Sequence, residues 1–191
     1  MTLSFLPIPL RDIALGQIAL VACCLVYLAW WCVAFRPGGG SGGGLGYALL
    51  AVTIMLAGVG MSLDIAGLRA LWDGAAGRMA LRILIAGVIA YPLLLLVTMR
   101  CFHRVPTTEL LLIVAWAVLE ALVVTMLVLA GLAADGAALP CALAIAVATA
   151  VGLACYLVCY RLAPWPAFYC RMVPLGLDAL AMAFVTWRLL P

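Results

Sequence analysis

Long apolar segments separated by short polar turns run along the whole chain. Each segment has about the 20 residues that a helix needs to cross a hydrocarbon layer roughly 30 Å thick. The pattern therefore predicts an all-α, polytopic membrane bundle of about six transmembrane helices, in which residues 1–191 form a single integral membrane domain. The expected spans are residues 13–35, 46–71, 79–101, 109–132, 138–161 and 167–190.

Prolines and glycines mark the expected ends of these spans. Pro7 and Pro9 place the preceding segment at the membrane interface, and Pro164 and Pro166 are expected to end the fifth span. The glycine-rich stretch 37–44 is typical of a flexible linker, because it lacks the strand, helix and lysine of a phosphate-binding loop. These turns are too short to hold a soluble domain.

The second span carries small residues that predict close approach of another helix. Gly58, Gly60 and Ser62 lie within it. The first three and last three spans could also form two inverted repeats, the plan of many secondary transporters.

Composition agrees with lipid as the solvent of this chain. Apolar residues make up 70% of it and charged residues 9%, whereas about half is apolar in typical soluble domains. All ten basic residues are arginine, so a Schiff base to retinal or pyridoxal phosphate is excluded. The arginines divide evenly between the two sides, so the positive-inside rule predicts no orientation. The expected location is a bacterial inner (cytoplasmic) membrane.

The eight cysteines fall mostly in apolar segments, where we expect them to act as small hydrophobic side chains and not as disulfides. Cys155 and Cys159 share a helix face, and with Cys170 they could bind a soft metal ion. No histidine cluster or Cys-x-x-Cys pair supports such a site. We therefore expect neither a metal nor a cofactor.

Two acidic residues near the middle of their spans are the strongest functional candidates. Glu120 lies in the fourth span and Asp178 in the sixth, and a charge at such a depth costs roughly 2.5–3.5 kcal/mol on insertion scales. Because the two spans run in the same direction, the carboxyls should lie at similar depth and could share one site. Both cannot ionise there without a cation, which fits proton or cation coupling. The alternative is that they only hold helices together through hydrogen bonds.

Several neighbouring residues extend this expected substrate or ion site. Pro174 precedes Asp178 and predicts a broken helix with an exposed carbonyl. Trp116 and Tyr91, which is next to Pro92, are expected to line a cavity. Arg171 either faces an anionic substrate or extends to the lipid headgroups.

Three further charged residues are expected to be structural. Asp64 and Arg82 lie at comparable depth on the same side and predict an ion pair. Glu109 falls in the first turn of the fourth span, where the helix dipole favours an acid.

These patterns favour a small transporter, channel or substrate-binding membrane subunit for a small solute, coupled to protons or another cation through the midplane acids. One alternative is an intramembrane enzyme that acts on a lipid or isoprenoid through Asp64, Glu120 or Asp178. Enzyme activity is less favoured, because these acids are isolated from one another along the chain and do not resemble a magnesium site. The other is a structural or assembly subunit. Expected partners are the bilayer, a small molecule or ion, and a second copy or another membrane subunit, but no nucleic acid.

Overall fold

Six long apolar helices make up nearly all of the computed structural model, which describes residues 7–38, 43–103 and 108–189. Each is long and apolar enough to cross a membrane, so the chain is an integral membrane protein and the predicted all-α six-helix bundle is confirmed. The helices are α1 Ile8–Ala34, α2 Gly43–Ala70, α3 Gly74–Phe102, α4 Thr108–Leu129, α5 Ala138–Val158 and α6 Pro164–Leu189, with a short 3-10 turn, η2, at Cys159–Arg161.

Helix ends differ from the predicted spans mainly at prolines and glycines. Pro7 is the N-cap of α1, and Pro164 is the first residue of α6. A proline lacks the amide hydrogen that the first turn of a helix leaves unpaired anyway, so it begins a helix as readily as it ends one. At the other end of α4, Gly131 adopts a φ of 68° and stops the helix at Leu129, three residues before the predicted end. Residues 39–42 of the predicted linker, and position 190, lie outside the described residues.

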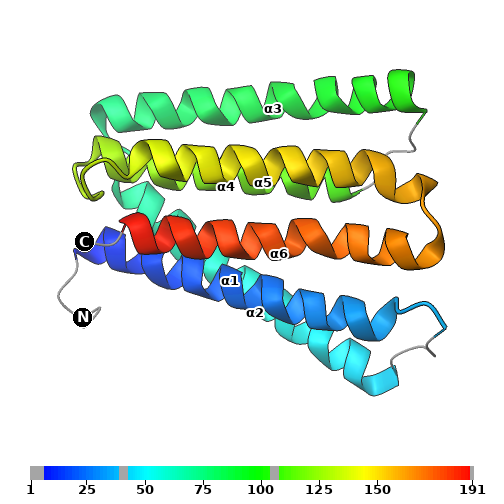
Figure 1. The fold of residues 1–191 in the computed structure, drawn as a ribbon. Helices are drawn as coiled ribbons and strands as arrows, with labels where there is room; N and C mark the ends of the chain where they lie inside the picture. Colours follow the sequence, from blue (N-terminus) through cyan, green and yellow to red (C-terminus); the bar gives the residue numbers. More distant parts are fainter. Residues whose placement is uncertain (1–6, 39–42, 104–107, 190–191) are drawn as a thin grey trace.

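The helices lie roughly side by side, with α3 at one edge and the α1–α2 pair at the other (Figure 1). α3 packs against α4, α4 against α5, α5 against α6, and α6 against α1. α2 crosses α1 obliquely and makes its largest contact there (Figure 1). α6 packs between α5 and α1, whereas the main contact of α3 is with α4, so the two halves of the chain pack differently.

Glycines allow α1 and α2 to approach each other closely. A Cβ at Gly60 would lie 2.7 Å from Leu20 Cγ and 3.0 Å from the Gly16 carbonyl oxygen. A Cβ at Gly67 would lie 2.8 Å from the Pro9 carbonyl oxygen. The predicted close approach is therefore confirmed at Gly60, whereas Gly58 has open space in front of it.

Buried apolar side chains gather at the end of the bundle where α1 begins and α6 ends (Figure 1). The cluster is built from the first turns of α1, α3 and α5 and the last turns of α2, α4 and α6. Its fully buried members include Val123, Met126, Cys141 and Val185. Tight packing at this end leaves the opposite half of the bundle as the place where space remains between helices.

Candidate functional site

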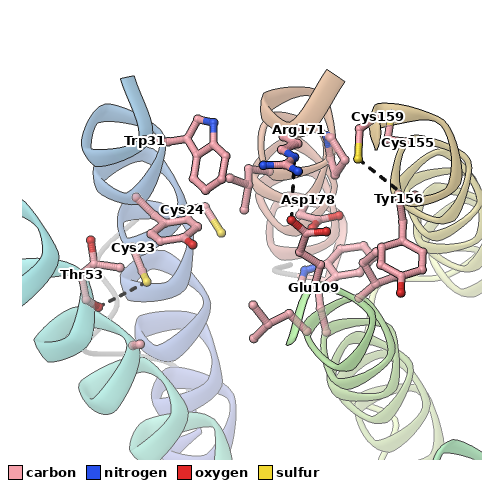
Figure 2. A pocket seen from close by; sticks show the side chains of 18 of the residues that line it. Cys23, Cys24, Trp31, Thr53, Glu109, Cys155, Tyr156, Cys159, Arg171 and Asp178 are labelled. Carbon is pink, nitrogen blue, oxygen red and sulfur yellow. Dashed lines mark hydrogen bonds and ion pairs between the residues drawn. The ribbon is translucent and has the colours of Figure 1, made fainter. Parts of the chain in front are cut away.

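A cavity of about 420 Å³ lies among α1, α2, α4, α5 and α6 (Figure 2). Its walls are mainly aliphatic and aromatic, with thiols, one threonine and three charged side chains among them. The lining residues come from the halves of the helices near the α1–α2, α3–α4 and α5–α6 turns. The cavity therefore extends from that end of the bundle to about the middle of its helices. Its volume falls within the range of roughly 300–1,000 Å³ that small-molecule sites occupy.

A cluster of charged and aromatic side chains lies at the outer end of this cavity, and we call it the mouth cluster: Trp31, Glu109, Tyr160 and Arg171. Arg171 Nε lies 3.9 Å from Glu109 Oε1, and the Tyr160 hydroxyl donates a hydrogen bond of 3.0 Å to Glu109 Oε2. The Arg171 guanidinium carbon lies 4.5 Å from the centre of the Tyr160 ring and 5.9 Å from that of Trp31. The cluster thus joins α1, α4, η2 and α6 across the mouth.

These contacts give Glu109 and Arg171 a more specific role than the sequence predicted. From the sequence, Glu109 was expected only to interact favourably with the helix dipole. In the structure its side chain lines the cavity and pairs with Arg171. Arg171 points into the cavity, above Asp178 (Figure 2). Its charge is already partly balanced, so it is not an isolated anion site.

Asp178 forms the floor of the cavity. Its side chain lines the cavity near the middle of α6, together with Pro174 and Leu175 of the same helix and Trp116 of α4. Among the described residues, no hydrogen bond or ion pair to its carboxyl is found. A carboxyl without a partner at the base of an apolar cavity is suited to receive a proton or a positively charged group.

A second polar group lies deeper than this floor, enclosed by α1, α2 and α4. Gln17, Asp64 and Glu120 form it, and their exposed fractions are 1%, 0% and 0%. Gln17 Nε2 donates a hydrogen bond of 3.1 Å to Asp64 Oδ2. Gln17 also approaches Glu120, but neither oxygen of Glu120 completes a hydrogen bond with another described residue.

The structure therefore brings together most of the predicted site. Trp116, Arg171, Pro174 and Asp178 line one cavity, whereas Glu120 lies below it and Tyr91 lies on the peripheral helix α3, outside the lining. Glu120 remains within electrostatic range of Asp178, but the two carboxyls occupy different environments.

Two detailed expectations need correction. Asp64 pairs with Gln17 and not with Arg82, which is exposed, because α2 packs on α1 and makes little contact with α3. Helix α6 is also continuous through Pro174 rather than broken there. The missing amide hydrogen still leaves the Cys170 carbonyl without its helical donor.

Gln17 is the residue that the sequence reasoning missed. An amide in the middle of an otherwise apolar span is the same kind of signal as an acid there, since each must find a polar partner away from water. It could have been noticed on that ground alone.

Four thiols also line the cavity: Cys23, Cys24, Cys155 and Cys159. No disulfide joins any of the eight cysteines, all of which lie in the described part of the chain. Cys170 Sγ lies 3.9 Å from the Cys155 carbonyl oxygen, as a weak hydrogen bond. Within the described ranges, no group of three or more histidine, cysteine or acidic side chains is arranged to hold a metal ion.

Comparison with protein-family models, with curated proteins and with solved structures finds no match to this chain.

Proposed function

We propose that this integral membrane protein is a small secondary transporter, or the solute-binding membrane subunit of one, and that it acts in a bacterial cytoplasmic membrane. The observation that carries the proposal is the cavity between five helices, which runs from one end of the bundle to a carboxyl near its middle. Such a cavity gives a solute access from one side of the membrane to a site at the midplane, as alternating access requires.

The lining of the cavity favours a solute with an apolar body and one positive charge. Aromatic and aliphatic side chains form most of the wall, and Asp178 is the charged lining group that has no hydrogen-bond or ion-pair partner within the described ranges. Glu109 and Arg171 largely balance each other at the mouth. An organic cation would bury its apolar part against Trp116 and Tyr27 and place its charge beside Asp178.

Binding of tetraphenylphosphonium, an aromatic organic cation, tests this proposal directly. Equilibrium dialysis of the purified protein in detergent should give saturable binding that Asp178→Asn weakens by about tenfold or more, because the substitution removes the Coulomb attraction between carboxylate and cation, which is about 2–4 kcal/mol over roughly 4–8 Å in a protein site. Asp135→Asn is the matched control, since Asp135 is exposed in the α4–α5 turn at the opposite end. Equal affinity in all three proteins would contradict a role for Asp178 in solute binding.

Coupling between solute transport and proton transport is tested in proteoliposomes. Addition of the same cation on one side should drive proton movement through the wild-type protein, and both Glu120→Gln and Asp178→Asn should abolish it while the protein stays folded by circular dichroism. Solute-driven proton movement that survives both substitutions would show that the midplane acids do not couple the two fluxes.

A further inference from the structure

The enclosed polar group below the cavity has more acceptor atoms than donors. Four buried oxygens lack a hydrogen-bond partner among the described residues: Gln17 Oε1, Asp64 Oδ1, and both Oε atoms of Glu120. The amide nitrogen of Gln17 carries two hydrogens, of which one is donated to Asp64 Oδ2, and the other could reach at most one of these four oxygens. A buried oxygen without a donor is costly, so protonation of the carboxyls, which adds hydrogen atoms that the ionised forms do not have, stabilises this arrangement.

Among the residues that the structure describes, no positive side chain offsets these acids. In the described part of the chain, the ionisable groups that act on Glu120 are Asp64 on α2 and Asp178 on α6, and Glu120 in turn acts on Cys24 of α1 and Cys141 of α5. Arg188 of α6 acts on Cys141 but is not among the groups that act on Glu120 or Asp64. Two ionised carboxylates here would place two negative charges inside the bundle with no counter-ion.

We propose that Gln17, Asp64 and Glu120 form an occluded proton-binding site that holds two protons, separate from the solute cavity above it. The inference rests on the proposed function for its role, because these would be the protons exchanged with the solute. One proton lies on Glu120, whose hydroxyl donates to Gln17 Oε1. The amide of Gln17 donates to Asp64 Oδ2, and the second proton lies on Asp64 Oδ1.

The position of this site relative to the cavity gives the direction of proton exchange. Glu120 lies one helical turn beyond Trp116, which lines the cavity, and within electrostatic range of Asp178 at its floor. On the far side of Gln17, packed Ile13, Val123 and Val185 leave a void of only about 10 Å³. That is the lower limit for one water molecule. In this conformation the protons therefore exchange with the cavity side through Glu120 and Asp178.

Infrared spectroscopy of the protein in liposomes tests the site without any transport assay. Protonated carboxyl groups absorb at a carbonyl frequency distinct from that of carboxylates and amides. We expect the wild type at neutral pH to show two protonated carboxyl bands that exchange slowly in deuterated water. Glu120→Gln should remove one and Asp64→Asn the other. Gln17→Met, of similar volume but without the amide, should shift the frequency of both.

Glu109→Gln and Asp135→Asn are the matched controls and should leave both slow bands in place, because Glu109 lies at the mouth of the cavity and Asp135 is exposed in the α4–α5 turn. Carboxylate bands in place of protonated ones at neutral pH would overturn the proposal, as would protonated bands that disappear when sodium is added. The wild-type spectrum alone decides this even if a variant fails to fold. Failure of solute binding with both bands present would reject the proposed function and leave the site, whereas intact binding without the bands would reject only the site.

Discussion

Asp64 fits between α1 and α2 because residue 16 on the neighbouring helix is glycine. A Cβ at position 16 would overlap the Asp64 carboxyl and would lie 2.9 Å from the Asp64 backbone nitrogen. The next residue, Gln17, then donates its hydrogen bond to Asp64. At the scale of single residues, the enclosed polar group depends on the absence of a side chain at Gly16 as much as on its own polar atoms.

Gly16→Ala is therefore expected to destabilise the protein by about 1–3 kcal/mol, the usual cost of forcing an extra carbon into a packed interior. Gly58→Ala is the control, because a Cβ there has nothing within 4 Å. It should leave the free energy of unfolding unchanged or raise it slightly through better helix propensity. Unfolding in mixed micelles, followed by circular dichroism, measures both. An equal effect of the two substitutions would contradict the close approach at Gly16.

Depth along a span was predictable from sequence, but pairing between spans was not. Counting residues from the ends of apolar segments placed Asp178, Trp116 and Arg171 correctly enough that all three line one cavity. The partner of Asp64 could not be found in this way. It depends on which helices pack together and on their rotation, and hydropathy carries no information about either.

At the scale of elements, the mouth cluster holds the open ends of the helices together. Arg171 on α6 contacts Glu109 at the start of α4 and the Tyr160 ring in η2. The side chains of Arg171 and Glu109 are about one third exposed, at 30% and 35%. A pair exposed to this extent contributes little to stability, commonly less than about 1 kcal/mol. Its effect on the width of the mouth is expected to be larger than its effect on folding.

We therefore expect Glu109→Gln to change the access of reagents to the cavity more than it changes the free energy of unfolding. Loss of the ion pair releases Arg171 from α4, so a maleimide should react several times faster with Cys24 inside the cavity, in a variant that retains this thiol alone. The free energy of unfolding should change by less than about 1 kcal/mol. Asp12→Asn is the control, because it removes the Arg11–Asp12 pair, with its 3.6 Å contact, at the opposite end of the bundle. Equal labelling rates in the two variants would show that the mouth cluster does not restrict entry.

The presence of each helix was predictable from the sequence, because a long apolar segment is a strong signal. The residues at which several helices begin or end were not predictable. Proline can stop a helix or start one, and Pro164 starts α6 although the sequence pattern suggested that it ended the preceding span. The distinction depends on which neighbouring backbone groups are paired, which only the folded chain determines.

At the scale of the whole molecule, the bundle is packed at one end and open at the other. The buried apolar cluster lies at the end where α1 begins and α6 ends, and the cavity lies in the opposite half, with the Gln17–Asp64–Glu120 group at the boundary. This asymmetry predicts that solutes and water reach the midplane from a single side of the membrane.

Labelling with a membrane-impermeant maleimide tests this asymmetry in sealed vesicles, using variants that each retain one cysteine. Cys101 is exposed at the end of α3, near the α3–α4 turn, and Cys24 lies in the cavity that opens at the same end. Both should react from the same side, in the same proportion. Cys141 is fully buried near the opposite end and should react only after denaturation. If the chain inserts in both orientations, a fraction of each thiol should react from each side of the vesicle. From a given side, the reactive fraction of Cys24 should equal that of Cys101. Reaction of Cys24 and Cys101 from opposite sides would mean that the cavity opens at the packed end, which the fold does not allow.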